Sequence, residues 1–450
     1  MQKNQVIETT CLRLGAQMEG VCFHEGMAVF VPYALPGEDI RCLITKVEKR
    51  HAFGKLKEVK TPAPARREPP CPVFYRCGGC AAQHMAYDQT LQYKRTQVED
   101  CFRHIGGLTV AVPPVIGMAD PWEYRNKTAL PVGGEPGSPK IGFYAPRSHT
   151  IVEIDSCPIT MGGLNGVLKA VRSWMEAYRV PPYREETHTG LVRHIMARAS
   201  RQGEVMAVIV INGQTLPREK ELLYALQKEV PAFVSLCVSV HTARGNVILG
   251  DTYRVLWGAE RLTDRLCGLA FSLSPLSFFQ INPVQTEVLY QTALNFAELH
   301  GTETVMDVYC GAGTISLMLA RHAQRVIGLE AVEAAVRDAR ENARANGIAN
   351  AEFLAGPAEA LLPRLVEEGL RPEVIVLDPP RKGVEPGVVE AIAKAGPERV
   401  VYVSCNPATQ ARDAALFLQK GYRITRCQSV DMFCWTGGVE NVLAFSRIPG

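Results

Sequence analysis

The chain has 450 residues, of which 47% are hydrophobic and 21% charged. These proportions are ordinary for a soluble globular protein and exclude a largely disordered chain. Because domains usually contain ~100–200 residues, we expect two to four of them. The longest apolar run, Val205–Ile211, is far shorter than the ~20 residues of a membrane-spanning helix. The first residues lack the apolar core of a signal peptide, so we expect a cytosolic protein.

The formal net charge of +3 is too small to identify a partner, but the basic residues are unevenly distributed. Residues 41–67 contain nine Lys or Arg and two acidic residues, a local excess of +7. Such a segment can attract phosphate groups. Taken alone, however, it is more typical of a solvated basic face.

The N-terminal part is predicted to be a small β unit. Its apolar stretches, such as Ala28–Pro32 and Asp39–Thr45, are short and separated by Gly and Pro, which favours a five-stranded barrel. Residues 61–70 contain four prolines and indicate a stiff linker.

The middle of the chain is less clearly patterned. A helix is predicted near residues 87–104. Val205–Ile211 and residues 232–241 are apolar enough to be strands of a mixed sheet, whereas residues 120–142 look loop-rich.

From about residue 300 the pattern is that of a doubly covered parallel sheet. Apolar strands alternate with helices, one of which is predicted over residues 331–346 with Val332, Val336, Ala339 and Ala343 on its buried face. Ligands of such sheets bind beyond the carboxyl ends of the strands. The predicted strands cover residues 304–309, 325–330, 373–378 and 399–404.

A nucleoside-binding loop is predicted after the first of these strands. In Asp307-Val-Tyr-Cys-Gly-Ala-Gly313, Gly311 and Gly313 allow the backbone to turn tightly and lie close to a ligand. Glu330 ends the next strand, where a carboxylate can accept both hydroxyl groups of a ribose. The third glycine of the dinucleotide fingerprint is missing, which favours S-adenosylmethionine. The weaker alternative is a glycine turn of any α/β domain.

Two further strand ends carry polar side chains. Leu377-Asp-Pro-Pro-Arg-Lys-Gly383 closes one strand and Val403-Ser-Cys-Asn-Pro407 closes the next. Methylation of an amine needs no thiol, whereas C5 of uracil becomes nucleophilic only after a group adds to C6. Cys405 fits that role, and Glu440 fits the base that later removes the C5 proton. Alone, Cys405 would more often be a small buried hydrophobic residue.

Five segments together resemble the RNA uracil-5-methyltransferases, a family whose bacterial members modify 23S ribosomal RNA or tRNA. The resemblance covers nearly the whole chain. The segments are Phe278-Phe-Gln-Ile-Asn282, Asp307-Val-Tyr-Cys-Gly-Ala-Gly-Thr314, Leu377-Asp-Pro-Pro-Arg-Lys-Gly383, Val403-Ser-Cys-Asn-Pro-Ala-Thr409, and Asp431-Met-Phe433 with Val439-Glu440.

The resemblance implies roles for individual residues. Cys405 would be the nucleophile and Glu440 the base. The S-adenosylmethionine site would include Gln280, Tyr309, Glu330 and Asp378, and the uracil would be bordered by Phe278, Gln280 and Asp378.

The chain departs from the family at two positions. Cys434 replaces the usual Pro after Asp-Met-Phe, and Gly438 replaces a His two residues before Glu440. These changes bear on the geometry around Glu440 and not on Cys405.

The chain has fourteen cysteines, and in a reducing compartment clustered cysteines are more often metal ligands or catalytic groups than disulfides. Cys71, Cys77 and Cys80 have the spacing C-x5-C-x2-C. A zinc site or a [4Fe–4S] cluster needs a fourth ligand, for which Cys101 and Cys157 are candidates, and the residues alone leave both metals open. The resemblance to iron–sulfur members of the family implies a [4Fe–4S] cluster with Cys157. Three unrelated cysteines are the least favoured alternative.

The N-terminal unit also resembles a known module. Glu19-Gly-Val-Cys-Phe-His-Glu-Gly26 and Phe30-Val-Pro-Tyr-Ala-Leu-Pro-Gly-Glu38 look like the TRAM domain, a small RNA-binding barrel of OB-like type. This resemblance implies that the basic residues at 41–67 contact RNA phosphates. The target base would have to be unstacked or flipped, with Phe278 as its aromatic neighbour.

We therefore expect an α/β multidomain enzyme with three parts: a TRAM barrel (1–60), an α+β central domain with an iron–sulfur cluster (61–270) and a Rossmann-like catalytic domain (271–450). The expected function is S-adenosylmethionine-dependent C5-methylation of a uridine in 23S rRNA by a monomer that binds neither DNA nor membranes. The alternatives are a tRNA-directed enzyme of the same chemistry, a catalytically silent RNA-binding or assembly factor, and an amino-methyltransferase. The silent factor is supported only by Cys434 and Gly438 and is disfavoured by the presence of Cys405 and Glu440. Cys405 also disfavours the amino-methyltransferase.

Overall fold

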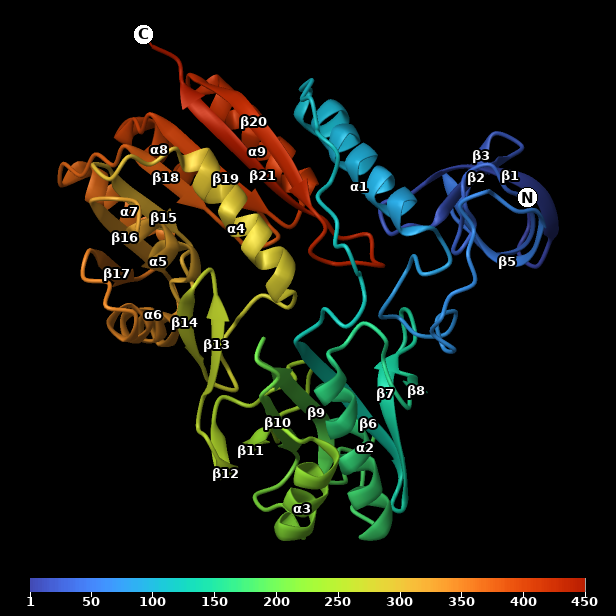
Figure 1. Cartoon of the computed structure of the whole chain (residues 1–450). Helices are drawn as coiled ribbons and strands as arrows, with labels where there is room; N and C mark the ends of the chain where they lie inside the picture. The colour runs from blue at the N-terminus through green and yellow to red at the C-terminus, as the bar shows by residue number, and fades with distance from the viewer. Residues whose placement is uncertain (450) are drawn as a thin grey trace.

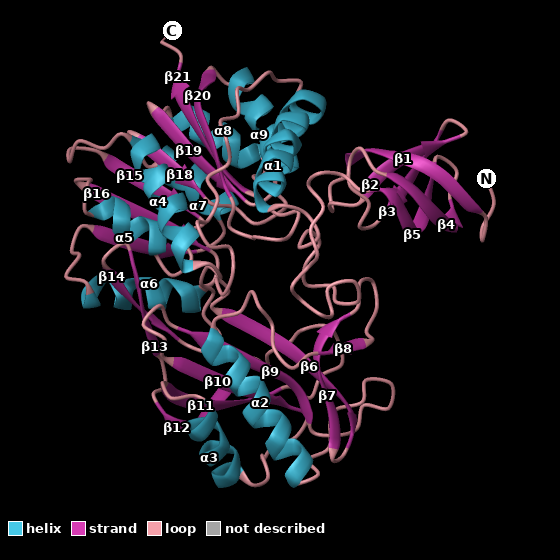
Figure 2. Cartoon of the chain, turned by 45° about the vertical axis from the view of Figure 1, so that its right-hand side comes forward, coloured by secondary structure: helices cyan, strands magenta, loops and turns pink. Residues whose placement is uncertain are grey.

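The computed structural model describes residues 1–449. It consists of a small barrel, a central sheet with two helices, and a larger sheet covered by helices on both faces (Figures 1 and 2). Every helix among residues 1–449 is too short or too polar to span a lipid bilayer.

The N-terminal unit is a closed five-stranded barrel, as predicted. Its core contains three cysteines together with aliphatic side chains. The strands follow the order β1-β2-β3-β5-β4 around the barrel; they are β1 (Val6–Leu14), β2 (Gly20–His24), β3 (Met27–Val31), β4 (Asp39–Val47) and β5 (His51–Thr61).

The proline-rich segment after the barrel has no helix or regular strand beyond Thr61, but it packs firmly. Arg66 forms an ion pair with Glu38, whose side chain is fully buried, and it also donates to the carbonyl of Tyr33 at 2.7 Å. The segment is therefore attached to the barrel over this stretch.

The central unit is a seven-stranded mixed sheet of order β12-β11-β10-β9-β6-β7-β8, with α2 and α3 packed on one face. Within the stretch expected to be loop-rich, residues 127–135 and 138–144 are strands. That prediction was wrong because most of the glycines and prolines of this stretch, which we took for loop signals, lie within a hairpin in which β6 and β7 pair directly. The elements are β6 (Lys127–Glu135), β7 (Ser138–Tyr144), β8 (Ile151–Glu153), α2 (Gly162–Ala177), β9 (Val192–Ala199), β10 (Val205–Ile211), α3 (Glu219–Glu229), β11 (Phe233–Val240) and β12 (Tyr253–Gly258).

The C-terminal unit is a second seven-stranded sheet, of order β17-β16-β15-β18-β19-β21-β20. The first five strands are parallel, and β21 is antiparallel to both of its neighbours. Separate apolar clusters fill its two faces. The strands are β15 (Thr304–Val308), β16 (Arg325–Glu330), β17 (Ala351–Ala355), β18 (Val374–Leu377), β19 (Arg399–Ser404), β20 (Tyr422–Val430) and β21 (Glu440–Arg447).

Helices α4 to α9 cover this sheet, and a hairpin of β13 (Leu262–Leu266) and β14 (Leu269–Leu273) precedes them. Val332 is an exposed N-cap of α6 and not part of its buried face. The helices are α4 (Pro283–Ala297), α5 (Thr314–Ala320), α6 (Glu333–Ala345), α7 (Ala358–Glu367), α8 (Pro386–Ala395) and α9 (Pro407–Gln419).

Helix α1 (Tyr87–Cys101) confirms the helix predicted near residues 87–104 and continues into a π-helical turn (Phe102–Gly106). It lies within the segment that we assigned to the central domain, yet it packs beside α9 on the C-terminal sheet (Figure 2). Val98 and Phe102 belong to the apolar cluster of that sheet. The helix therefore joins a stretch near the barrel to the unit that carries the candidate site.

Candidate functional site

The loop between β15 and α5 has the backbone shape expected of a nucleoside-binding turn. Tyr309, Gly311 and Gly313 all have positive φ, at 74°, 56° and 81°. A Cβ atom on Gly313 would lie 3.1 Å from Ala339 and from the ring of Phe353. Only glycine fits there without strain or displacement of these neighbours.

Glu330 closes this loop from the next strand. Its carboxylate accepts hydrogen bonds from the backbone N–H groups of Gly311 (3.1 Å) and Val332 (2.7 Å). The Asn342 amide, on α6, donates to the carbonyl of Ala312 at 3.1 Å. The structure thus brings the glycine loop and the acidic strand end together.

Two carboxyl groups on adjacent strands have pKa values that are raised toward neutrality. Burial raises the pKa of Asp307 to about 7. Burial, and then the neighbouring charge of Asp307, raises the pKa of Asp378 to about 7. Carboxyl groups that are poised near neutrality occur often at functional sites. Tyr290 lies beside Asp378 and Gln280, and its hydroxyl group is 3.1 Å from that of Thr314.

Cys405 follows β19, and Glu440 is the first residue of the neighbouring strand β21. The antiparallel register pairs Ser404 with Asn441, so Cys405 and Glu440 emerge side by side at the same sheet edge. Glu440 is buried and Cys405 half-buried.

Electrostatic neighbours connect this pair to Arg381 and Asp378. Burial, followed by the charges of Glu440 and Asp378, raises the pKa of the Cys405 thiol, whereas Arg381 acts in the opposite direction. Burial and Asp378 raise the pKa of Glu440 well above its usual value, again against Arg381. Arg381 therefore offsets part of the increase in the pKa of both Cys405 and Glu440.

The loops that carry Asp378 and Cys405 are joined through the backbone of Arg381. Its carbonyl accepts hydrogen bonds from the side chains of Asn406 (3.0 Å) and Thr409 (3.3 Å). Asn406 also caps α9 by accepting from the N–H of Ala408 at 3.2 Å. The two loops therefore form one connected surface.

The predicted uracil-bordering loop lies between β14 and α4. Phe278 is 75% exposed, which is unusual for so large an apolar side chain. The backbone of this loop is held by the central unit, because Asn126 donates to the carbonyls of Gln280 (3.1 Å) and Ile281 (2.9 Å). An exposed aromatic ring on a fixed loop is suited to stacking against a base.

The four proposed cluster ligands line one cavity of about 170 Å³. Charge interactions with Cys71 and Cys157 contribute to the raised pKa of Cys77 and Cys80, so the four thiols are close neighbours. Cys101 lies on α1 and lines a different cavity, next to the barrel. Within residues 1–449, no three His, Cys, Asp or Glu side chains are arranged to hold a single metal ion.

Three residues of the site were not assigned roles from the sequence. Arg381 lies in the recognised segment that begins at Leu377. Its position just after a strand end was the only indication in the sequence that it belongs to the site. Thr314 ends the recognised segment that begins at Asp307, whereas Tyr290 lies on α4, where nothing local distinguishes it from an ordinary packing residue.

Comparison with known proteins places these features in a family. The model of the tRNA (uracil-5-)-methyltransferase family matches residues 261–448, and that of the TRAM domain matches residues 2–57. Uncharacterized RNA methyltransferases of Clostridium tetani and Halalkalibacterium halodurans are 43% and 45% identical; each match covers 98% of this chain and 96% or 97% of the relative.

A solved structure is similar over almost the whole chain. It is the Pyrococcus abyssi tRNA (uracil-54, C5)-methyltransferase in complex with S-adenosyl-L-homocysteine. It has a TM-score of 0.79 and 26% identity, and the match covers 98% of this chain and 100% of that one. A C-terminal methyltransferase fold that uses S-adenosylmethionine, preceded by a TRAM barrel, makes this chain a member of the RNA (uracil-5-)-methyltransferase family.

Proposed function

We propose that this enzyme methylates C5 of a uridine in 23S ribosomal RNA, with Cys405 as nucleophile and Glu440 as base. The observation that carries the proposal is the position of these two side chains at one sheet edge, next to Asp378 and Arg381. An RNA-binding factor without catalysis would have no need of a thiol and a buried carboxyl group there.

The chemistry follows from these positions. The Cys405 thiolate adds to C6 of the uracil, which makes C5 nucleophilic. S-adenosylmethionine supplies the methyl group that C5 accepts. Glu440 then removes the remaining C5 proton; the C5–H electron pair forms the C5=C6 double bond, and the C6–S bond breaks to release the Cys405 thiolate.

The donor would be held by the residues around the glycine loop. Gly311 and Gly313 leave room for close approach of the backbone, and Glu330 would accept the ribose hydroxyl groups. Gln280, Tyr309 and Asp378 would line the remainder of this site, and Phe278, Gln280 and Asp378 would border the uracil.

We further propose a [4Fe–4S] cluster on Cys71, Cys77, Cys80 and Cys157. A tetrahedral zinc site needs four ligands that converge ~2.3 Å from one ion. A four-iron cluster is larger, and thiols around a cavity of about 170 Å³ fit it better. Since the proposed methyl transfer needs no electron transfer, the role of the cluster would be to hold residues 71–82, which we call the cysteine segment, and to help shape the RNA surface.

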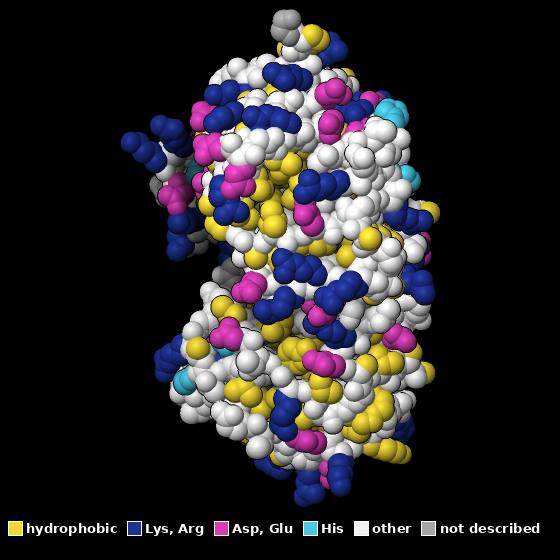
Figure 3. All heavy atoms as spheres, turned by 90° about the vertical axis from the view of Figure 1, so that its left-hand side faces the viewer, with side chains coloured by type: hydrophobic (Ala, Val, Ile, Leu, Met, Phe, Trp, Pro, Cys, Tyr) yellow, Lys and Arg dark blue, Asp and Glu magenta, His cyan; other side chains and the backbone are white. Residues whose placement is uncertain are grey.

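RNA binding would involve the barrel. Lys49, Arg50, Lys55 and Lys57 form no ion pair within residues 1–449, whereas Arg41, Lys46 and Lys60 pair with acids. On the face of the larger units shown in Figure 3, basic and acidic side chains alternate. The cations of the barrel that form no ion pair are candidates for phosphate contacts.

The choice of RNA rests on resemblance, because the barrel and the cysteine set together are similar to the ribosomal members. The alternative is tRNA, which the Pyrococcus abyssi neighbour uses according to its description. Nucleoside mass spectrometry separates them: unmodified 23S rRNA and tRNA are incubated separately with the protein and S-adenosylmethionine. New 5-methyluridine in rRNA alone is expected, and product in tRNA alone overturns the choice.

Cysteine variants test both the proposed nucleophile and the proposed ligands of the cluster. Cys405→Ala should abolish the product and the stable adduct with 5-fluorouracil-containing RNA. Cys101→Ala, a matched thiol on α1 outside the site, should keep both. After anaerobic purification, Cys157→Ala should lose iron and visible absorption while Cys101→Ala retains them; zinc without iron in the unmodified protein contradicts the cluster.

A further inference from the structure

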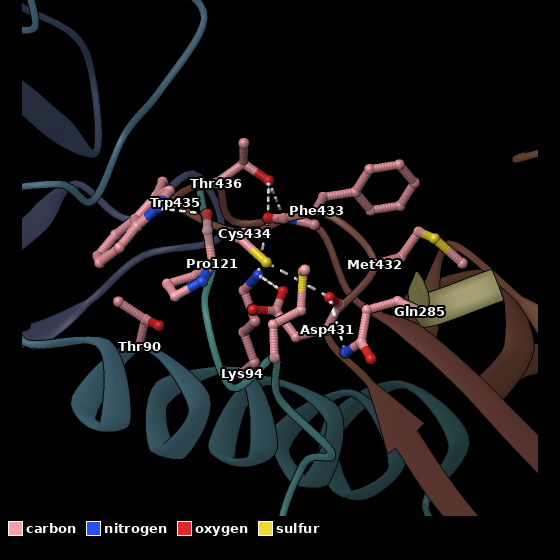
Figure 4. Close-up of polar contacts among 12 residues, drawn as sticks. Thr90, Lys94, Pro121, Gln285, Asp431, Met432, Phe433, Cys434, Trp435 and Thr436 are labelled. Atoms are coloured by element: carbon pink, nitrogen blue, oxygen red, sulfur yellow. Dashed lines mark hydrogen bonds and ion pairs between the residues drawn. The ribbon is translucent and has the colours of Figure 1, made fainter. Parts of the chain in front are cut away.

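The loop that leads to Glu440 is held in place by distant parts of the chain. It runs from Asp431 to Val439 and contains both departures from the family pattern, Cys434 and Gly438. A Cβ atom on Gly438 would lie 3.0 Å from the ring of Phe433, so glycine leaves room for that ring. Figure 4 shows the loop against α1 and the segment at Pro121.

The cysteine segment forms two hydrogen bonds to this loop. The backbone N–H groups of Ala81 and Ala82 both donate to the carbonyl of Trp435, at 2.8 and 3.1 Å. They directly follow Cys80 in the sequence. The carbonyl of Trp435 is thus joined to the residues next to a proposed cluster ligand, five positions before Glu440.

The backbone at Trp435 has a positive φ, a conformation that is strained for a residue with a side chain. Its φ of 64° lies in the left-handed region, which a non-glycine residue of this size rarely occupies. Such conformations persist where the surroundings determine them. The two bonds from Ala81 and Ala82 are part of those surroundings.

The indole side chain provides a second attachment. Its Nε1–H donates to the carbonyl of Pro121 at 3.0 Å, and its ring stacks on Trp122 with centroids 4.6 Å apart. The side chain is almost completely buried and packs near Cys80 and Cys157. Trp435 is therefore attached to the cysteine segment through its backbone and to Pro121 and Trp122 through its side chain, within the apolar cluster against which Cys80 and Cys157 pack.

We propose that Trp435 is a positioning residue that transmits the order of the cysteine segment to Glu440, so that release of the methylated uracil depends on that segment. The inference rests on the proposed roles of Cys405 and Glu440. It assigns the cysteine segment a task in one step only, the removal of the C5 proton.

This dependence has a chemical signature. If Glu440 is displaced after methyl transfer, the C5 proton stays in place and the C6–S bond to Cys405 cannot break. A covalent protein–RNA complex that carries the methyl group then accumulates on ordinary uridine-containing RNA. A variant that merely unfolds the site forms no such complex.

The test compares Trp435→Gly, Trp435→Phe and Cys80→Ser with the unmodified holoenzyme, using uridine-containing 23S rRNA and labelled S-adenosylmethionine. Glycine tolerates the positive φ but removes the indole, and phenylalanine keeps an aromatic ring. We expect Trp435→Gly and Cys80→Ser to lower turnover at least tenfold and to leave a labelled complex stable to denaturation. Trp435→Phe should restore most of the turnover, and Trp257→Phe, a distant half-buried tryptophan, should resemble the unmodified protein.

A second readout does not depend on turnover. Relative to the unmodified protein, Cys80→Ser should shift tryptophan emission to longer wavelength, because the Trp122–Trp435 stack loosens. The shift should persist in a Trp257→Phe background and vanish in a Trp435→Phe background.

The outcomes distinguish a failure of the proposed chemistry from a failure of the positioning role of Trp435. Without an adduct of the unmodified enzyme on 5-fluorouracil RNA, the proposed chemistry itself fails. If that adduct forms but Trp435→Gly turns over normally, or loses turnover without trapping a labelled complex on uridine RNA, the positioning role of Trp435 is wrong.

Discussion

The ammonium group of Lys94 forms an ion pair with the carboxylate of Asp431, and both side chains are fully buried. Lys94 also donates to the carbonyl of Phe433 at 3.0 Å, and Tyr87 donates to Asp431 at 2.7 Å. Helix α1 therefore holds the start of the loop that ends at Glu440 (Figure 4). The pair is the main polar contact of α1 with that loop.

Removing one partner of this pair should be costly. We expect Lys94→Met to lower the free energy of unfolding by about 3–5 kcal/mol, because Asp431 is left as an uncompensated buried charge. Denaturant unfolding measures the change. Lys94→Met with Asp431→Leu should recover part of it, and Arg364→Met, which breaks an exposed pair with Glu368, should change stability by less than about 1 kcal/mol. A loss from Lys94→Met no larger than that of Arg364→Met would contradict the prediction.

Donor binding should depend on pH through Asp378. Since its pKa is raised to about 7, the carboxyl group is mostly protonated at pH 6 and ionised at pH 8. The ionised form attracts the positive sulfonium of S-adenosylmethionine, so affinity should rise roughly tenfold over this range. Calorimetry with S-adenosylhomocysteine, which shares the amino group but lacks the sulfonium charge, serves as the reference.

The Asp378→Asn variant checks the origin of that effect. It should remove the pH dependence of the ratio between the two dissociation constants. If the ratio still changes between pH 6 and pH 8 in this variant, another group is responsible.

Arg381 should control the reactivity of Cys405. The thiol has a raised pKa, so the rate of adduct formation with 5-fluorouracil RNA should increase with pH above neutrality. Arg381→Gln removes the cation that stabilises the thiolate and should move the profile to higher pH. We expect a several-fold slower rate at neutral pH and a smaller difference in alkaline solution.

Lys382→Gln is the matched control, because Lys382 is the adjacent cation and pairs with Glu385. It should leave the pH profile in place. Equal shifts in both variants would mean that general positive charge, and not the position of Arg381, sets the thiol reactivity.

The barrel should contribute salt-dependent RNA affinity. Replacing Lys49, Arg50, Lys55 and Lys57 by Gln should weaken RNA binding and reduce the slope of log K against log salt by about 0.7 for each lost contact with single-stranded RNA. Binding of S-adenosylmethionine should not change. Unaltered RNA affinity would count against a phosphate-binding role.

Substitution is preferable here to removal of residues 1–60. Glu38 of the barrel is the buried partner of Arg66, so deletion would expose an unpaired cation and disturb the following segment. Gln replacements of Arg41 and Lys60, which already pair with Glu58 and Glu8, provide a control of the same substitution type and should have a smaller effect for each charge removed.

The sequence by itself determined four strands of the C-terminal sheet, β15, β16, β18 and β19, and the polar residues at their ends, but not β17 or the antiparallel pair of β20 and β21. Parallel strands bring their carboxyl ends to one edge, so the alternation of strands and helices was enough to place Asp307, Glu330, Asp378 and Cys405 there. The five-stranded barrel was likewise readable from short apolar stretches between turn residues. These signals are local, because the apolar stretch and the flanking turn or polar residues of each strand are contiguous in the sequence.

Only the tertiary structure decided the contacts between distant segments. It packed α1 on the C-terminal sheet and paired Lys94 with Asp431. It also placed Arg381 beside Cys405 and Glu440. Such contacts depend on which surfaces meet when the chain packs, and residues far apart in the sequence carry no local pattern that records those contacts.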